Sequence, residues 1–489
     1  MSDLLAEARA LMAQGRAADA LSRLKRLPAD APAVAHHFHS QALKAVGRME
    51  DAVAPARRAA DLSPTGVAYR HNLAALLGDL DRNAEAEDAA RQALAIGGDA
   101  PETWLVLGRA LQGLNRFDQA DAAYRAAVQR RPGYADALKE LSQLIWMRTG
   151  EVKQATAELD AAIAAQPGDP AIRIVKARLL DYAGRPEAAY AALTQGPLNP
   201  AGELTAAQLA LHIAPARALA HARRIEATAP TAHPVRLVLA EAHLALGQPD
   251  QALTYLEALS AATPLDQYVI ALSATAWRMT GDPRYPALYD YDAFVRPSLI
   301  DTPDGWPDLP SYLADLKRTL VALHGLKTHP VGQSLRGGSQ TTAALKRSDD
   351  PVIQAFFQAI DGPIRRYMDA VGQGTDILRS RNTGAYAIAG SWSVRLRPNG
   401  FHADHVHPQG WLSSACYIDL PDAVEGSGNE GWIQFGHPAI PTPQPLPAEH
   451  VVKPQPGTLV LFPSYMWHGT IPFGGDQHRL TIAFDVIPQ

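Results

Sequence analysis

Cysteine is almost absent from this chain: Cys416 is the single one among 489 residues. An intrachain disulfide is therefore excluded, and a reducing cytoplasm suits such a composition. Long apolar runs are lacking too, because no stretch of about 18 apolar residues occurs, so we expect no membrane span. The opening residues, Met-Ser-Asp-Leu-Leu-Ala-Glu, include an early acid and lack an apolar segment of signal-peptide length. We therefore expect a cytoplasmic protein that does not associate with a membrane.

An excess of positive charge is also missing. The chain has 45 Lys and Arg against 50 Asp and Glu, which gives a formal net charge of −5. This balance predicts no nucleic-acid partner, although a locally basic groove is compatible with it. Hydrophobic residues make up 47% of the chain, which is enough for about two to four domains with buried cores.

What the N-terminal half does have is a repeat of about 34 residues, in the tetratricopeptide pattern. Residues 101–134 show it most clearly, and residues 33–66 and 67–100 repeat it in register. Small residues inside each unit let its two helices meet, and a proline near the end stops the second helix. The pattern residues of the clearest unit are Trp104, Leu107, Gly108, Leu111, Ala120, Tyr124, Ala127 and Pro132.

Looser helix pairs extend this pattern on both sides, over residues 3–28 and from 135 to about 280. We therefore predict that residues 1–280 form an α-solenoid of about seven to eight helical hairpins. Such solenoids bind extended peptides or helices, so we expect a protein or peptide ligand on the repeat array. Residues 281–489 are predicted to form a second domain, with helices over 313–326 and 351–372.

From about residue 384 the hydrophobic period changes to two, which indicates strands. Gly, Pro and Asn clusters separate the strands, and no helical pattern lies between them. This organisation predicts an antiparallel barrel or jelly roll. The expected strands cover residues 392–397, 412–418, 432–435, 458–462 and 480–484.

Histidines and one acid near the C-terminus have the spacing of a metal site. A facial triad takes two ligands from one short segment and one from far away, and it leaves three positions open. In the first segment two pairs compete, His402 with Asp404 and His405 with His407. Successive side chains of a strand point to opposite faces, so on a regular strand the even-numbered pair and the odd-numbered pair cannot both face the metal. We favour the second pair because it directly precedes the next strand, with His468 as the distant ligand, and the His-x-Asp pair stays open.

Arg479 and Thr481 lie beyond His468 on one face of a predicted strand. An Arg and a Thr that point together into a barrel indicate an anion site, since the guanidinium binds a carboxylate with two bonds. This combination is what a non-haem iron(II), 2-oxoglutarate-dependent oxygenase requires. Tyr417 and Ser413, on the strand after the metal pair, are further candidates for contact with the co-substrate.

A polar run before the barrel offers two interpretations. Gln333, Arg336 and Gln340 form either a hydrogen-bonded loop or a wall of a substrate site. We include them as candidate substrate-binding residues, together with Trp411.

About 200 C-terminal residues resemble the bacterial 2-oxoglutarate/Fe(II) oxygenases that carry an N-terminal tetratricopeptide array. The resemblance implies a double-stranded β-helix with flanking helices that uses Fe(II), 2-oxoglutarate and O₂, and hydroxylation with release of succinate and CO₂. Carried over to this sequence, it assigns the metal to His405, His407 and His468, and the co-substrate to Arg479. The family's first segment reads His-x-His where the best-understood oxygenases have His-x-Asp. The resembling segments are 333–341, 391–396, 405–413 and 457–464, with His468 and Arg479.

We therefore expect an oxygenase, a hydroxylase that acts on a protein or peptide presented by the repeat array. One alternative is a repeat-based binding scaffold with a catalytically silent barrel. Another is a three-His metal dioxygenase that does not use 2-oxoglutarate. Arg479 with Thr481 favours the first hypothesis, because a silent barrel has no need of an anion site beside a metal.

Overall fold

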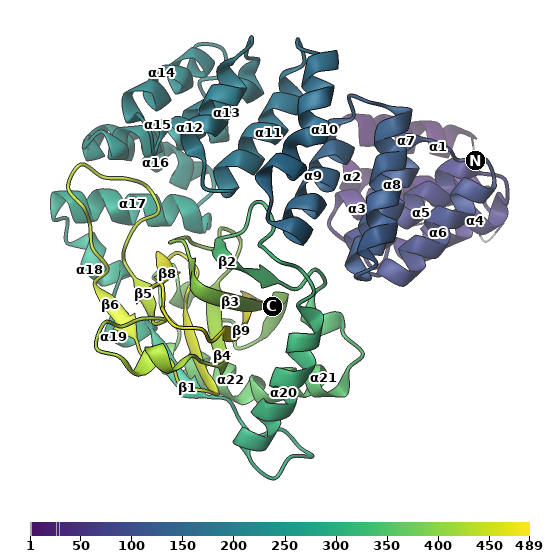
Figure 1. Ribbon diagram of the computed structural model, residues 1–489. Helices are drawn as coiled ribbons and strands as arrows, with labels where there is room; N and C mark the ends of the chain where they lie inside the picture. Colours follow the sequence, from purple (N-terminus) through teal and green to yellow (C-terminus); the bar gives the residue numbers. More distant parts are fainter. Residues whose placement is uncertain (1, 26, 29) are drawn as a thin grey trace. The chain divides into compact units, whose positions relative to one another are not determined.

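The computed structural model describes residues 2–25, 27–28 and 30–489, and the chain separates into two compact units, Met1–Leu144 and Ile145–Gln489. The first unit is built from paired helices (Figure 1). They are α1 (Ser2–Ala13), α2 (Ala17–Leu24), α3 (Ala33–Ala45), α4 (Val53–Leu62), α5 (Val67–Asp79), α6 (Asn83–Ala95), α7 (Pro101–Gly113), α8 (Phe117–Arg130) and the start of α9 (Ala135–Thr149).

The small residues of the repeat pattern sit where paired helices touch. A Cβ atom on Gly108 of α7 would lie 2.4 Å from the Tyr124 ring of α8, and Tyr124 is fully buried. The glycine therefore sets how closely the two helices approach, as the repeat pattern predicts.

The second unit continues the helical hairpins. Proline stands in the first turn of α11 to α16, where its missing N–H costs no helical hydrogen bond. These hairpins confirm the predicted solenoid. Their helices are α10 (Val152–Ala165), α11 (Pro170–Tyr182), α12 (Pro186–Thr194), α13 (Pro200–Ala210), α14 (Pro215–Glu226), α15 (His233–Ala245), α16 (Pro249–Ala262) and α17 (Gln267–Thr280).

Shorter helices and strands follow α17. The helix predicted over 351–372 is interrupted at Ile360 and forms two helices. The helices are α18 (Arg284–Leu288), α19 (Tyr291–Phe294), α20 (Leu309–Leu323), α21 (Pro351–Ala359) and α22 (Asp361–Val371). The strands are β1 (Arg296–Leu299), β2 (Leu335–Gln340), β3 (Tyr386–His402), β4 (Leu412–Asp419), β5 (Ile433–Phe435), β6 (His450–Val452), β7 (Thr458–Pro463), β8 (His468–Thr470) and β9 (Arg479–Pro488).

The strands form two antiparallel sheets. The larger has the order β1-β7-β4-β9-β3-β2 and the smaller has the order β6-β5-β8. They pack through Phe462 of β7 and Phe435 of β5, whose ring centroids are 5.0 Å apart. This antiparallel two-sheet domain confirms the fold class expected from the sequence.

Arg336 and Gln340 of the polar run lie on strand β2, whereas Gln333 precedes it. The partner of β2 is β3, and a Cβ atom on Gly338 would lie 2.6 Å from the carbonyl oxygen of Arg395 on that strand. The glycines that suggest a loop in the sequence therefore allow two backbones to approach closely.

Helices cover one face of the larger sheet. Phe356 of α21 contacts Phe484 of β9, with ring centroids 6.1 Å apart. The other face of β9 is thereby left to line a cavity. In the part of the chain that the structure describes, no helix is both long and apolar enough to cross a membrane.

Candidate metal centre and its cavity

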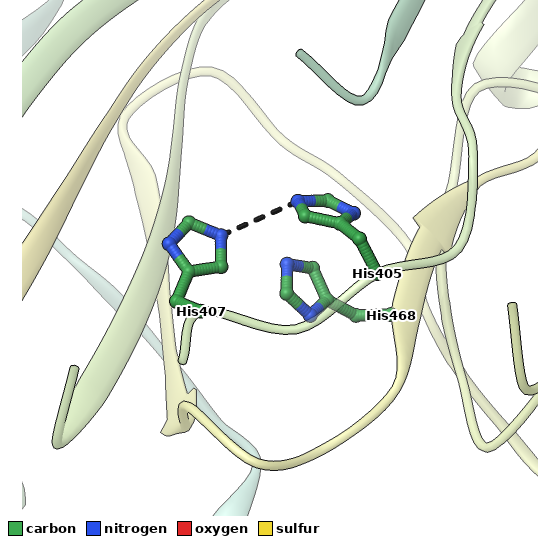
Figure 2. Close-up of side chains that lie close together, drawn as sticks. All are labelled: His405, His407 and His468. Atoms are coloured by element: carbon green, nitrogen blue, oxygen red, sulfur yellow. Dashed lines mark hydrogen bonds between the residues drawn. The ribbon is translucent and has the colours of Figure 1, made fainter. Parts of the chain in front are cut away.

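Backbone pairing brings three histidines together from distant segments. His405 and His468 form a β-bridge in which each N–H donates to the other's carbonyl oxygen, at 2.9 and 3.1 Å. The His407 N–H donates to the Ser464 carbonyl at 3.1 Å. The imidazole rings converge as a result (Figure 2), and one nitrogen from each lies within 4.8 Å of the others.

Hydrogen bonds at the outer nitrogens set the orientation of all three rings. The Nδ1 atoms of His405 and His468 are 2.9 Å from the carbonyl oxygens of Ala403 and Met466. The Nδ1 atom of His407 is 2.6 Å from a carboxylate oxygen of Asp485. Since all three acceptors take a proton from Nδ1, the Nε2 atoms are the ones that face one another, and that of His405 also lies 3.2 Å from the Ser334 hydroxyl.

This arrangement fits a bound metal ion. The Nε2 atoms of His405 and His407 are 3.3 Å apart (Figure 2), which is a hydrogen bond only if one of them carries a proton. With the protons on Nδ1, both lone pairs are directed to the same space and are free for a metal ion. Burial lowers the pKa of His405 to about 3, with the neighbouring His407 as a further cause, so the ring stays neutral. Burial also lowers the pKa of His468 well below its usual value. Three imidazoles that face one point are a ligand set for iron, zinc or copper.

The competing pair, His402 and Asp404, takes other partners. His402 ends β3, and its Nδ1 is 3.0 Å from the Ser334 hydroxyl. The Asp404 carboxylate accepts from Gln434 Nε2 at 3.0 Å and lies 2.9 Å from His437 Nδ1. That carboxylate raises the pKa of His437. Both His402 and Asp404 line the cavity, but neither belongs to the cluster of converging ligand atoms found among the described residues.

A buried arginine lies in the same cavity without a counter-ion. Arg479 is 2% exposed, and no acidic side chain in the described ranges forms an ion pair with it. Its guanidinium lies 5.0 Å from the centre of the Tyr417 ring, and among the described residues neither its Nε atom nor the Tyr417 hydroxyl has a partner at hydrogen-bond geometry, although the two side chains are close enough to interact electrostatically. Burial lowers the pKa of Arg479, and Tyr417 offsets part of this effect. A buried cation with free donors fits a carboxylate ligand.

The cavity that contains these groups has a volume of about 1020 Å³. Its inner wall is one face of β9, which presents Arg479, Thr481, Ala483 and Asp485. Gln333, Arg336 and Gln340 of the polar run also line the cavity. The repeat array contributes Asp181, Tyr182 and His212.

Tyr182 of the array contacts the oxygenase domain at the wall of the cavity. The Arg336 guanidinium lies 5.1 Å from the centre of the Tyr182 ring, and His329 Nε2 is 2.9 Å from the Tyr182 carbonyl. The end of α11 is therefore attached to the segment that leads into β2.

Comparisons with known protein families agree with this geometry. Residues 390–485 match the family described as "Putative 2OG-Fe(II) oxygenase", and residues 105–170 and 214–275 match two families described as "Tetratricopeptide repeat". This chain joins tetratricopeptide repeats to a domain of the 2OG-Fe(II) oxygenase family. The matched oxygenase segment contains the three histidines, Arg479 and Asp485.

Several solved structures are similar to parts of the chain. A tetratricopeptide repeat protein from Parabacteroides merdae is 13% identical, with 56% of this chain and 98% of that chain covered and a TM-score of 0.36. MamA from Desulfovibrio magneticus is 17% identical, with 34% and 94% covered and a TM-score of 0.32. PilF from Pseudomonas aeruginosa is 19% identical, with 43% and 97% covered and a TM-score of 0.30. No curated protein matches the chain.

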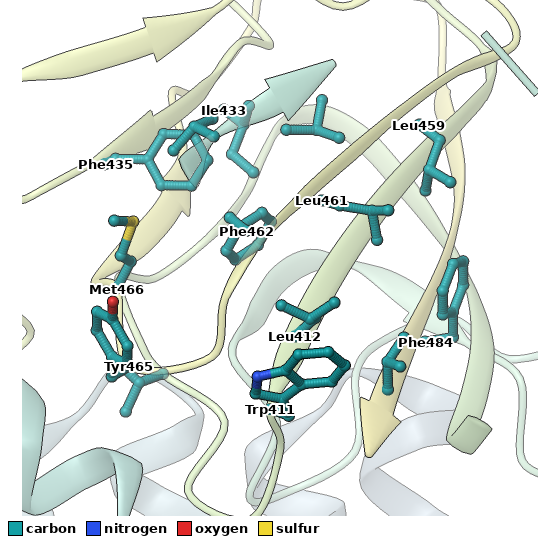
Figure 3. Close-up of a cluster of buried hydrophobic side chains, with 14 of the residues drawn as sticks. Trp411, Leu412, Ile433, Phe435, Leu459, Leu461, Phe462, Tyr465, Met466 and Phe484 are labelled. Carbon is teal, nitrogen blue, oxygen red and sulfur yellow. The ribbon is translucent and has the colours of Figure 1, made fainter. Parts of the chain in front are cut away.

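Three of the expected site residues, Trp411, Ser413 and Tyr417, do not line the cavity. Trp411 is 1% exposed and belongs to the hydrophobic core (Figure 3), where its indole N–H donates to the Leu378 carbonyl at 2.9 Å. The structure therefore places Trp411 in packing and not at the substrate wall. Ser413 is buried as well, and its hydroxyl lies 2.9 Å from the Ser464 hydroxyl and 3.3 Å from an Asp485 oxygen. It supports the carboxylate that holds His407.

Some site residues of the oxygenase domain are not evident from the motifs. Asp485 continues the alternation of Arg479, Thr481 and Ala483, and this signal is present in the sequence. Asp181 and His212 have no such signal, since nothing in a repeat pattern shows which helix end meets a distant barrel.

Proposed function

We propose that the protein is an Fe(II)/2-oxoglutarate-dependent dioxygenase, a hydroxylase whose substrate is a protein or peptide presented by the repeat array. The observation that carries this proposal is the presence, in one cavity, of three converging imidazoles and a buried arginine that has no counter-ion among the described residues. Either feature alone suits several functions. Together they match the needs of one metal and one dicarboxylate.

His405, His407 and His468 would hold the iron through their Nε2 atoms. When bound, Fe(II) supplies the redox chemistry that couples decarboxylation of 2-oxoglutarate by O₂ to hydroxylation of the substrate. The protein's part is to hold the three rings in a fixed orientation through their Nδ1 atoms. Asp485 does this for His407, and backbone carbonyls do it for the other two.

Arg479 and Thr481 would bind the far carboxylate of 2-oxoglutarate. The Arg479 fork offers two parallel N–H bonds, and the Thr481 hydroxyl on the same face of β9 offers a third. Tyr417 does not line the cavity, and its ring beside the guanidinium would help to hold Arg479 in place. Ser413 would act indirectly, through Asp485.

A polypeptide substrate is supported by the outer wall of the cavity. Its volume of about 1020 Å³ accommodates a side chain together with adjoining backbone. Asp181, Tyr182 and His212 of the repeat array line the same cavity as Gln333 and Gln340. A segment bound along the array would therefore pass the metal site, with Arg336 and the two glutamines in contact with it.

Two broader assignments belong to the same proposal. The repeat array comprises residues 1–280, and the oxygenase domain comprises residues 281–489. The compartment is the reducing cytoplasm, which suits a ferrous enzyme whose lone Cys416 is buried.

The decisive experiment adds Fe(II) and 2-oxoglutarate to the metal-free protein without oxygen and records the visible charge-transfer band of the chelate. His468→Ala is expected to abolish the band. Arg479→Lys keeps the charge but loses the two-bond geometry, so it should need about 10 to 100 times more 2-oxoglutarate. Arg318→Lys, an exposed position, is the matched control and should behave as the parent protein.

Two other results would change the assignment. Iron binding without a band would overturn the use of 2-oxoglutarate and favour a three-His dioxygenase. Absence of both iron and 2-oxoglutarate binding would favour the repeat-based scaffold with a silent barrel.

A further inference from the structure

Helix α17 differs from a repeat helix that borders solvent. From Val269 to Ala276 every residue is buried, and Gln267 at its start is 1% exposed. One side of α17 packs on α16, as in any repeat, and the other side meets the oxygenase domain (Figure 1). A helix that is buried all round is enclosed by structure on every side.

The strongest contact of α17 with the oxygenase domain is made by Trp467, the residue before His468. The Trp467 indole N–H donates to the Ala271 carbonyl at 3.2 Å and to the Thr275 hydroxyl at 3.0 Å. The Tyr268 ring meets the indole edge to face, with centroids 5.7 Å apart.

The backbone of Trp467 is held as firmly as its side chain. Its N–H donates to the Tyr289 hydroxyl at 3.2 Å, and its carbonyl accepts from the Gly436 N–H at 2.9 Å. With the indole bonds, every polar group of this residue has a partner. These bonds fix the position of the backbone from which the next residue, His468, extends.

The beginning of α17 contacts the other ligand segment. The Gln267 N–H donates to the carbonyl of Pro408 at 3.2 Å, and Pro408 directly follows His407. The end of α17 holds a third loop, because the Arg278 guanidinium donates to the Gly436 carbonyl at 2.8 Å. The helix therefore reaches chain neighbours of two of the three converging histidines.

We propose that α17 is a positioning element of the metal centre, so that a helix of the repeat array determines where His407 and His468 stand. This inference rests on the proposed metal site. Metal ligands must be held to within about 0.5 Å of their working positions, which requires support from a rigid element. In this protein that support comes from the array, and an oxygenase domain that began after α17 would lack it.

The chemistry of Thr275 permits a mild test of this role. Its hydroxyl donates to the Ala271 carbonyl at 2.9 Å, which leaves a lone pair to accept the indole N–H. Thr275→Val removes that acceptor and keeps the shape, whereas Thr275→Ser keeps the acceptor. Trp467→Phe removes the donor itself.

The same helix provides a matched control. The indole nitrogen of Trp277 is buried and has no hydrogen-bond partner. Trp277→Phe therefore removes an indole N–H from α17 without the loss of a hydrogen bond.

The experiment is a titration of the full-length, metal-free variants with Co(II), followed by the visible absorption of the bound ion. Trp467→Phe should weaken binding about 10- to 100-fold and change the absorption spectrum, as found for groups that support metal ligands. Thr275→Val should weaken binding a few-fold, and Thr275→Ser and Trp277→Phe should match the parent protein. The melting temperature of each metal-free variant separates this effect from a loss of stability.

The proposal is overturned if Trp467→Phe and Thr275→Val lower the melting temperature but leave the Co(II) affinity and spectrum as in Trp277→Phe. A parent protein that binds no Co(II) would overturn it too, together with the metal site. A parent protein that binds Co(II) but not 2-oxoglutarate would remove the oxygenase function and leave the positioning role to be decided by the same titration.

Discussion

Two buried arginines show how the repeat array and the oxygenase domain differ. Arg173 in the array and Arg479 in the oxygenase domain are each 2% exposed. Arg173 donates to the carbonyl oxygens of Pro167 and Pro197, at 2.5 and 2.6 Å. Arg479 has no ion pair within the described part of the chain, and it lines a cavity. The array uses its buried cation to satisfy backbone groups, whereas the buried cation of the oxygenase domain faces a cavity.

The largest expected effect tests the structural arginine. Arg173→Met should lower the free energy of unfolding by about 3 to 5 kcal/mol, because two charge-assisted hydrogen bonds are lost and two carbonyls lose their donors. Urea unfolding of the full-length protein measures this change. A loss below about 1 kcal/mol would show that the two bonds contribute little and would weaken the contrast with Arg479.

A buried acid of the array, Glu241, should make the stability of the protein depend on pH by a similar amount of free energy. Burial raises the pKa of Glu241 to about 7, although its bond from the Tyr268 hydroxyl opposes the shift. The folded state therefore binds a proton that the unfolded state has lost, so stability should fall as pH rises from about 4.5 to 7 and level off above that. The expected loss is on the order of 3 kcal/mol.

Glu241→Gln separates this effect from all other titrations. The variant keeps the shape of the side chain and cannot ionise, so its melting temperature should fall less than that of the parent protein between pH 5 and pH 8. Equal falls in the two proteins would show that Glu241 does not titrate in this range.

The functional arginine should respond in the opposite direction. Arg479→Met removes a buried charge without a counter-ion, so the protein without co-substrate should gain about 1 to 3 kcal/mol of stability. The same variant should no longer be stabilised by 2-oxoglutarate in a thermal melt. A loss of stability would mean that Arg479 is structural, like Arg173.

Helix contacts in the first unit should give a smaller effect. Gly108→Ala places a methyl group 2.4 Å from the Tyr124 ring, which should cost about 1 to 2 kcal/mol after the gain in helix propensity. Gly78→Ala in α5 is the matched control, because nothing lies within 4 Å of the added atom. The control should be neutral or stabilised by up to about 1 kcal/mol in the same unfolding experiment.

The smallest effect is expected at an exposed ion pair of the array. Arg16 and Asp19 are 2.8 Å apart, with side chains 58% and 55% exposed. Arg16→Ala should change the free energy of unfolding by less than about 0.5 kcal/mol, because solvent screens the pair. A larger change in urea unfolding would show that surface charge contributes to the array as much as packing.

The parts of the fold that the sequence predicts are those with local patterns. The helical hairpins follow from residues such as Gly108 and Tyr124, which are in contact within one repeat. Strand β9 follows from its alternation, which also places Arg479 and Thr481 on one face. Strand β2 is missed because its glycines resemble a loop, and only its pairing with β3 makes it a strand.

The candidate site shows the same division. The spacing of His405, His407 and His468 suffices to propose a ligand set, but it leaves His402 and Asp404 as competitors. In the structure Asp404 bonds to Gln434 and His437, which are far along the chain and belong to no motif. The assignment of Trp411 to the substrate wall has no support, because aromatic residues serve the core as readily as a cavity.

By itself, the sequence determined the repeat array, the antiparallel domain and the types of chemistry present, because periodicity and motif spacing are properties of neighbouring residues. Only the tertiary structure decided which histidines converge and that Arg479 has no counter-ion within the described residues. It also decided that α11 of the array lines the cavity and that α17 contacts the segments that carry the histidines. The physical reason is that these features depend on burial and on contacts between segments up to about 200 residues apart, such as Ala271 and Trp467. No local pattern encodes which of many compatible surfaces will meet when the chain folds.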